Sequence, residues 1–152
     1  MEVIVESPGG SSVKYKFDKK SNKFKLLKAL PTGMVFPFDF GFIPGTKGED
    51  GDPLDVLLVS EFRTFPGCVI DCRIVGCIVA EQQKEDRMIR NDRFIGVPEQ
   101  SRVYAGIHTI SDIPSRLITE IDQFFANYLK AEGKKLSILN HFNSQQALEL
   151  IK

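Results

Sequence analysis

Three aspartates stand close together in the short stretch DGDPLD, residues 50–55. Side chains alternate along an extended chain, so Asp50 and Asp52 point the same way, and a tight turn can bring Asp55 alongside them. Three carboxylates held close together repel one another and therefore need a counter-charge. Hard divalent cations with oxygen ligands, Mg²⁺ above all, suit such a group best. The stretch thus predicts a magnesium site.

Two other interpretations of DGDPLD stay open. Asp, Gly and Pro are all common in turns, so the same residues are also typical of a solvated turn that binds nothing. A calcium-binding EF-hand loop fits less well, because Leu54 stands where that pattern requires Asp or Asn.

The elements that must position these acids begin with short strands. Runs of β-type residues bounded by Gly, Pro, Ser and Asn turns indicate strands at residues 2–6, 13–17, 24–30, 53–60, 68–81 and 93–98. The first three are separated only by short turns, so we expect them to form a meander. Five or six strands are enough to close a small barrel.

From Ser111 the periodicity changes to that of an amphipathic helix. Apolar residues recur three or four apart from Leu117 to Leu129. Pro114 suits the first turn of such a helix, and Gly133 stands where its end is expected. A long helix therefore follows the strands.

A second, shorter helix is expected to begin at Asn143. Gln146 stands three residues further on, which is a capping-box pattern. The sequence contains no repeat, low-complexity tract or linker. Strands followed by helices predict one α+β domain over residues 1–152, with a mainly β core.

Composition argues against several classes of partner. The chain has 20 basic and 20 acidic residues, so its net charge gives no reason to expect binding to nucleic acid or to an anionic membrane. Phe36, Phe38, Phe40 and Phe42 alternate beside two prolines, which favours packing over base stacking. No apolar run approaches 18 residues. We expect no nucleic-acid or membrane partner and a cytoplasmic location.

The three cysteines do not suggest a zinc site. Cys68, Cys72 and Cys77 form no CxxC pair and have no histidine close by in the sequence. Cys72 and Cys77 lie in a β-rich run, where a free thiol behaves as a small apolar side chain. We interpret the cysteines as reduced packing residues, which fits a reducing compartment.

With these patterns in place, the sequence resembles a known family. DGDPLDV matches the signature of the soluble family I inorganic pyrophosphatases, and further segments match the family in the same order over nearly the whole chain. These segments are VIVESPGGSSVKYKFDKKSN, MVFPFDFGFIPGT, FPGCVIDCRIVG and SDIPSRLITEIDQFFANY. The resemblance implies an OB-like, five-stranded closed barrel with flanking C-terminal helices. It also implies several Mg²⁺ ions, hydrolysis of pyrophosphate to two phosphates, and a homo-oligomer, either a hexamer or a dimer.

The resemblance also implies a role for each matching residue. Asp50 and Asp55 would hold metal ions, and Asp52 would orient or deprotonate the attacking water. Glu6 would serve the metals on the substrate side. The positions that fall on or near phosphate contacts of the family are Lys14, Lys28, Arg93 and Tyr128. Such a set fits the chemistry, because pyrophosphate is highly anionic and its hydrolysis needs metal ions, basic side chains and an activated water.

Several residues depart from the family pattern. Lys16 stands where an acid is usual, and Phe40 stands where a tyrosine is usual. An arginine is usual at Lys28, and a lysine cannot reproduce the bidentate phosphate contact of a guanidinium.

The largest departure is the charged segment EQQKEDRMIRNDRF, which is longer than in the family. Alignment from the left puts Gln82 on one metal-binding aspartate, and alignment from the right puts Asn91 on the other. A neutral amide oxygen can still bind Mg²⁺, although more weakly. Asp92 lies beside Asn91 and is a further candidate ligand. Substitute acids inside the insertion are Glu81, Glu85 and Asp86.

Three hypotheses follow from these residues. The first is an active Mg²⁺-dependent pyrophosphatase with its first metal pair intact. The second is a slow or altered phosphohydrolase, because the changed residues all lie on the leaving half of the substrate. The third is a catalytically weak scaffold or anion-binding module, which would have no need for the three aspartates of residues 50–55.

Overall fold

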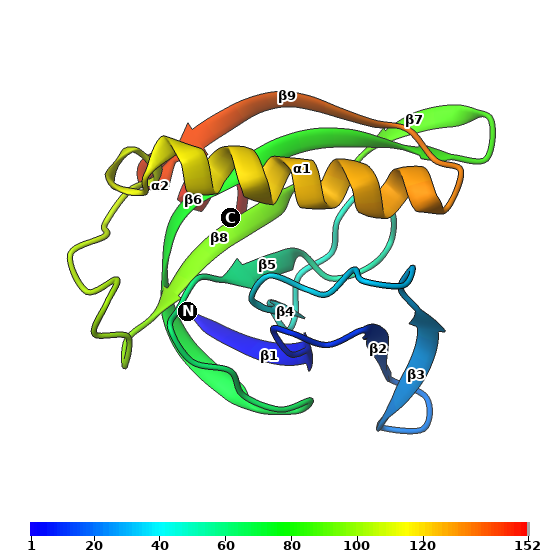
Figure 1. The fold of residues 1–152 in the computed structure, drawn as a ribbon, viewed down its shortest axis with the longest axis horizontal. Coiled ribbons are helices and arrows are strands. Elements are labelled where there is room, and N and C mark those ends of the chain that lie inside the picture. Colours follow the sequence, from blue (N-terminus) through cyan, green and yellow to red (C-terminus); the bar gives the residue numbers. More distant parts are fainter. Residues whose placement is uncertain (152) are drawn as a thin grey trace.

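The computed structural model of the chain describes residues 1–151, and strands make up most of its regular structure (Figure 1). The strands are β1 (Glu2–Ser7), β2 (Val13–Asp18), β3 (Lys23–Ala29), β4 (Asp39–Phe42), β5 (Asp55–Leu58), β6 (Val69–Lys84), β7 (Arg87–Arg90), β8 (Arg93–Pro98) and β9 (Leu136–Asn143). The helices are the 3₁₀-helix η1 (Ile110–Asp112) and the α-helices α1 (Ser115–Ala131) and α2 (Ser144–Ile151).

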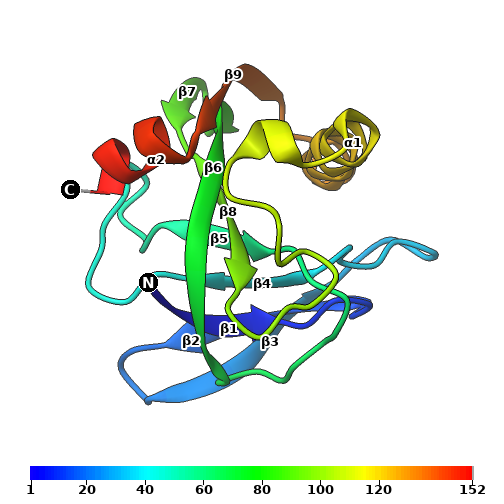
Figure 2. The same cartoon turned by 90° about the vertical axis from the view of Figure 1, so that its left-hand side faces the viewer.

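Five strands pair edge to edge in a closed ring. Going round the ring, β1 pairs with β4, β4 with β5, β5 with β8, β8 with β6, and β6 returns to β1. Figure 2 shows the long β6 running down one side of this ring. All these pairs are antiparallel except β5 with β8. The predicted fold class, a mainly β core with an OB-like arrangement of five strands, is confirmed.

The remaining strands lie outside the ring. β7 and β9 both pair with β6, which extends the sheet beyond the ring. β2 and β3 form a separate two-stranded sheet. The expected meander of the first three strands is therefore wrong. Its physical reason is that both edges of β1 are already taken by β4 and β6, so β2 has no free edge of β1 to pair with.

Three strands carried too little signal to be predicted. β4 has only four residues and lies in a segment rich in Pro and Gly. Its Gly41 is required, because a Cβ there would lie 2.1 Å from the backbone oxygen of Ile4 on β1. β7 forms within the charged insertion, and β9 lies between the two α-helices, in a stretch to which the sequence assigned no element.

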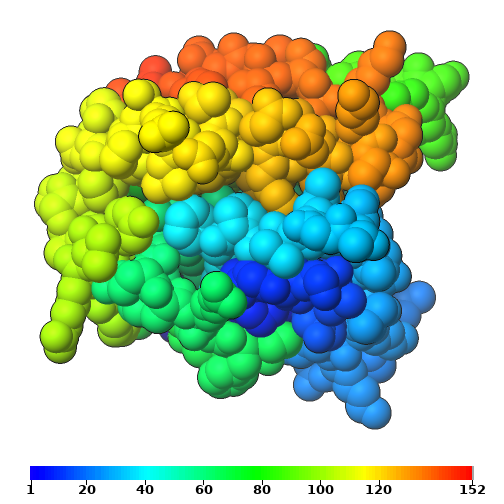
Figure 3. All heavy atoms as spheres, in the orientation of Figure 1, coloured from blue at the N-terminus to red at the C-terminus, as the bar shows by residue number. Residues whose placement is uncertain are grey.

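The long helix packs on one side of the ring over an aromatic core. Figure 3 shows α1, in yellow and orange, as a layer above the N-terminal segments in blue and cyan. Phe36 is 1% exposed, and its ring centroid lies 5.8 Å from Phe40 and 5.5 Å from Phe124 of α1. The phenylalanines of residues 36–42 thus mainly serve packing, as predicted, and they join the first half of the chain to α1.

The helix ends agree with the sequence signals to within a residue or two. Pro114 is the N-cap of α1, one position before the first turn in which it was expected. Gly133 follows the helix with φ of 73°, a left-handed conformation that glycine adopts without strain. At α2 the backbone N–H of Gln146 donates to Asn143 Oδ1, and that of Asn143 donates to Gln146 Oε1. The predicted capping box is confirmed.

The cysteines are unpaired. Cys72 and Cys77 are buried, and Cys68 is partly exposed. Burial raises the pKa of the Cys72 thiol to about 11 and raises that of Cys77 further, so both are inert packing groups near neutral pH. Within residues 1–151, neither α-helix has the length and apolar character needed to cross a membrane.

Candidate active site

A cavity of about 500 Å³ opens between the ring, the β2–β3 hairpin and the C-terminal half of α1. Nine of the predicted site residues line it. They are Glu6, Lys14, Lys28, Asp50, Asp52, Asp55, Asn91, Arg93 and Tyr128. The carboxylates and the basic side chains come from segments far apart in the sequence, and only the fold brings them together.

A tight turn presents the first two aspartates. The backbone N–H of Asp52 donates to Asp50 Oδ1 at 3.0 Å, and the N–H of Gly48 donates to the Asp52 carbonyl at 2.7 Å. Gly51 has φ of 87°, which this turn requires. Asp52 is exposed at the turn and Asp50 is partly exposed, so water and ions can reach both carboxylates.

Asp55 lies deeper, at the first position of β5. It stands opposite Arg93, the first residue of the parallel strand β8. Burial raises the pKa of Asp55 to about 7, although the positive charges of Arg93 and Lys14 oppose the shift. The neighbouring acids Glu6 and Asp50 add to it. A partly buried carboxylate with acids around it favours a bound cation.

Glu6 reaches the cavity from β1. Its Oε2 accepts a hydrogen bond from the backbone N–H of Phe17 on β2 at 2.8 Å. Burial raises the pKa of Glu6, and Lys14 and Lys16 partly offset this effect. The bond fixes the hairpin against the ring beside the aspartates.

Arg93 is a buried cation at the base of the cavity. Its side chain is 4% exposed, with Nη1 donating to the Asn91 carbonyl at 2.8 Å and Nη2 to Gln82 Oε1 at 2.6 Å. The guanidinium carbon lies 4.9 Å from the ring centroid of Phe125, close enough for a cation–π interaction. Burial lowers the pKa of Arg93, and the charge of Asp55 opposes this. The guanidinium is held in one place and remains the counter-ion of Asp55.

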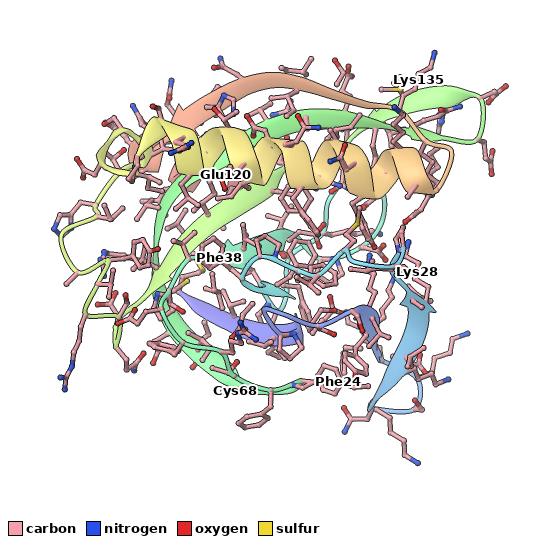
Figure 4. The ribbon with its side chains drawn as sticks, in the orientation of Figure 1. Phe24, Lys28, Phe38, Cys68, Glu120 and Lys135 are labelled. Carbon is pink, nitrogen blue, oxygen red and sulfur yellow. The ribbon has the colours of Figure 1, made fainter. Side chains whose placement is uncertain are left out.

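Two lysines gather around Tyr128 on α1. Lys28 Nζ lies 4.9 Å and Lys14 Nζ 5.6 Å from the ring centroid. Figure 4 shows Lys28 on β3, beside the C-terminal end of α1, where its ammonium pairs with Glu132. This side of the cavity is therefore positive, whereas the turn at residues 50–55 is negative.

Comparisons with known proteins match this arrangement. The model of the inorganic pyrophosphatase family matches residues 3–152. An inorganic pyrophosphatase of Halalkalibacterium halodurans is 36% identical over 152 residues, which cover 99% of this chain and 90% of the relative. The chain belongs to the inorganic pyrophosphatase family.

Further relatives of this pyrophosphatase family agree. A relative from Methanosarcina acetivorans is 36% identical over 150 residues, covering 99% of this chain and 87% of its own. The crystal structure of the inorganic pyrophosphatase from Thermus thermophilus superposes with a TM-score of 0.91 at 34% identity, covering 99% of this chain and 86% of that one.

The oxygen donors of the cavity fit a hard divalent cation such as Mg²⁺. Asp50, Asp52, Asp55 and Glu6 all contribute oxygen atoms to one cavity. Among residues 1–151, no three carboxylate, histidine or cysteine side chains lie close enough to enclose a metal ion by themselves. Mg²⁺ is usually held by one or two carboxylates together with waters and substrate phosphates, not by an all-protein cage. The open arrangement of the acids agrees with that habit.

Asp92 does not reach this cavity. Its Oδ1 accepts hydrogen bonds from Arg90 Nε at 2.6 Å and from the backbone N–H of Ala80 at 3.1 Å. It lines a second, smaller cavity, which shares Asp50, Pro53 and Asn91 with the large one. Asn91 and Asp92 form the link between β7 and β8. Asn91 lines both cavities and Arg93 lines the large one, whereas Asp92 lines only the second.

The charged insertion also leaves the cavity without acids of its own. Residues 81–84 of β6 pair with residues 87–90 of β7, so the insertion is a hairpin that projects from the ring (Figure 1). Glu85 and Asp86, at its tip, are exposed and do not line the cavity. Of this segment only Gln82, Asn91 and Arg93 line it.

Two charged residues of the cavity that contact predicted site residues were not identified as functional from the sequence. Lys16 donates to Asp52 Oδ2 at 3.3 Å, and Glu132 pairs with Lys28. Lys16 alternates with Lys14 along β2, so the period of the strand could have indicated that both face one way. Nothing in the sequence indicates the contact of Glu132, which lies just beyond the end of α1.

Proposed function

We propose that this protein hydrolyses inorganic pyrophosphate to two phosphates with the help of Mg²⁺. The observation that carries the proposal is the convergence of Asp50, Asp52 and Asp55 on one cavity with a set of basic side chains. Hydrolysis needs both groups, because basic side chains bind the anionic substrate and acids hold the metal ions that activate the attacking water. The cavity offers both, and membership of the inorganic pyrophosphatase family agrees.

The residues divide into two groups by their chemistry. A bound divalent cation would supply positive charge for the phosphates and lower the pKa of a coordinated water. Asp50, Asp55 and Glu6 would hold it, and Asn91 offers a neutral oxygen at the far end. Asp52, exposed at the turn, would accept the proton of the attacking water at a carboxylate oxygen.

The basic group would bind and orient the substrate. Lys14 and Lys28 reach the cavity from the β2–β3 hairpin, next to Tyr128. Arg93 is fixed by Asn91 and Gln82, so its charge costs no reorganisation when phosphate arrives. Together these residues would stabilise the charge that develops on the leaving phosphate.

A substrate other than pyrophosphate is a second candidate, favoured by one observation. Neutral Gln82 and Asn91 and the buried Arg93 line the end of the cavity at which the family pattern has two aspartates and a lysine. Fewer acids there would weaken metal binding near the leaving group. A substrate that needs less metal on that side would then be preferred.

A substrate panel distinguishes the two candidates. Phosphate release is measured from pyrophosphate, tripolyphosphate and a nucleoside triphosphate, each with Mg²⁺ and with a chelator. We expect pyrophosphate to have the highest kcat/KM and release to stop without Mg²⁺. A higher kcat/KM for another phosphoanhydride would favour the second candidate. Mg²⁺ binding that persists unchanged in Asp55→Ala would contradict the proposed ligand set.

Assembly and location belong to the same proposal. We propose a homo-oligomer, either a hexamer or a dimer, as the resemblance to the family implies, and a cytoplasmic location, as expected from the sequence. Light scattering coupled to size-exclusion chromatography would give the mass directly, and a mass of about 17 kDa, that of one chain, would contradict the oligomer.

A further inference from the structure

One basic residue of the cavity is bound to the proposed general base. Lys16 Nζ lies 3.3 Å from Asp52 Oδ2. The Lys16 side chain is 45% exposed and that of Asp52 54% exposed. The pair joins the β2–β3 hairpin, which is a separate two-stranded sheet, to the turn at residues 50–55, which leads into β5 of the ring.

The pair puts an ammonium where a metal ion would also be attracted. A carboxylate oxygen bonded to Lys16 is partly neutralised, and a divalent cation near Asp52 would be repelled by the ammonium beside it. Both cations, the Lys16 ammonium and the metal ion, are therefore attracted to the region of Asp52, and they repel each other. Lys16 is also one of the departures from the family pattern, which has an acid at this position.

Lys16 has another anion to bind once it leaves Asp52. Its side chain lines the cavity together with Lys14, two positions earlier on β2. A lysine side chain is a flexible stem carrying a compact charge, and nearly half of the Lys16 side chain is exposed. The Lys16 ammonium would therefore be able to reach the phosphate oxygens of a substrate that enters the cavity.

We propose that Lys16, paired with Asp52, opposes the binding of Mg²⁺ to the neighbouring acids Asp50, Asp55 and Glu6, and that the displaced Lys16 then binds the phosphate groups of the substrate. The inference rests on the proposed function. In the free protein Lys16 holds Asp52, and metal binding breaks this ion pair. The lysine then exchanges a carboxylate for a phosphate, so the same side chain opposes metal binding and supports substrate binding.

The expected effect follows from the exposure of the pair. Exposed ion pairs contribute up to about 1 kcal/mol, which corresponds to a factor of about five in a dissociation constant. Replacing Lys16 by an uncharged residue of similar length should therefore tighten Mg²⁺ binding about fivefold. It should also weaken binding of a diphosphate by a similar factor.

The experiment compares Lys16→Met with a matched control, Lys20→Met. Lys20 is in the turn of the same hairpin and lines the same cavity, but no carboxylate within residues 1–151 lies at ion-pair distance from it. The control therefore removes the same charge without breaking the Asp52 contact. Isothermal calorimetry measures Mg²⁺ binding to the metal-free proteins. A second titration adds methylenediphosphonate, which cannot be hydrolysed, at saturating Mg²⁺.

Opposite shifts in the two titrations are expected for Lys16→Met, tighter for Mg²⁺ and weaker for the diphosphonate. Lys20→Met should move each by less than about twofold, because its charge is exposed, screened by salt and not paired with a carboxylate of the cavity. If either titration gives the same change in both variants, the proposal is overturned while the proposed function stands. A wild-type protein that bound no Mg²⁺ would overturn both. Thermal melting of each variant checks that it is folded.

Discussion

The aspartate at the base of the cavity should destabilise the metal-free protein when it is ionised. Asp55 has a pKa of about 7 in the folded protein, raised by burial from 3.8. The folded state therefore holds this proton more tightly than the unfolded chain, and stability falls as the pH rises from about 4 to about 7. Replacing Asp55 by Asn removes the charge but keeps the shape, so Asp55→Asn should stabilise the metal-free protein above pH 7.

The magnitude follows from the difference between the two pKa values. The two pKa values correspond to a loss of unfolding free energy of about 4 kcal/mol at pH 8 and about 2 kcal/mol at pH 5. The raised pKa already includes the attraction of Arg93 and Lys14. Asp55 remains partly accessible through the open cavity, and solvent reduces the effect of burial. We therefore expect a gain of about 2 to 3 kcal/mol at pH 8 and about 1 kcal/mol at pH 5.

Urea unfolding followed by circular dichroism, in the presence of a chelator, measures this gain at the two pH values. Asp50→Asn is the control, because Asp50 lines the same cavity and its Asn replacement keeps the acceptor for the backbone N–H of Asp52. The control should change stability by less than about 0.5 kcal/mol. Asp55→Asn that is no more stable than wild type at pH 8, or that gains as much at pH 5, would refute the reasoning. Added Mg²⁺ should stabilise the wild type and not Asp55→Asn.

Three further predictions concern the scaffold. Gly41→Ala places a Cβ 2.1 Å from the Ile4 oxygen and should lower the free energy of unfolding by about 1 to 3 kcal/mol. Gly106→Ala is the control, because the space around Gly106 is open. Equal urea midpoints for the two variants would contradict this prediction. Glu61 accepts three hydrogen bonds from the loop after β8, which hold its pKa near 2 instead of 4.5. Its stabilisation is present above about pH 4.5 and is lost towards pH 2, so the stability deficit of Glu61→Gln should shrink between pH 6 and pH 3, and a constant deficit would count against it. Phe36→Ala should cost about 3 to 5 kcal/mol in urea unfolding, and a cost below 1 kcal/mol would show that the aromatic core is not tightly packed.

The sequence predicted the fold as far as local patterns reach. The periods of β1, β2, β6, β8 and α1 are long and regular, and so these elements were expected close to their observed bounds. The four residues of β4 are held by pairing with β1 and β5 on either side, which is long-range information. The prediction of a meander was wrong for the same reason. Turn residues predict that the chain reverses direction, but not which strand edge the next segment pairs with.

The sequence predicted the site residues that belong to a motif, but not those whose role depends on how their side chains are oriented in the fold. The aspartates of residues 50–55 were indicated by their spacing alone. The orientation of Asp92 is set by its hydrogen bonds with Arg90 and with the backbone of Ala80, which the sequence alone does not predict. From the sequence, Lys16 was identified only as a departure from the family pattern. The structure shows that its ammonium binds Asp52.

The most direct test is phosphate release from pyrophosphate by the wild type and by Asp52→Asn, each with Mg²⁺ and with a chelator. The Asn side chain keeps the size of Asp52 and its place in the turn but cannot accept the proton of the attacking water. The account predicts rapid, Mg²⁺-dependent release by the wild type and a loss of about 10²-fold or more in kcat for Asp52→Asn. Equal release by both proteins, or none by the wild type, would contradict it.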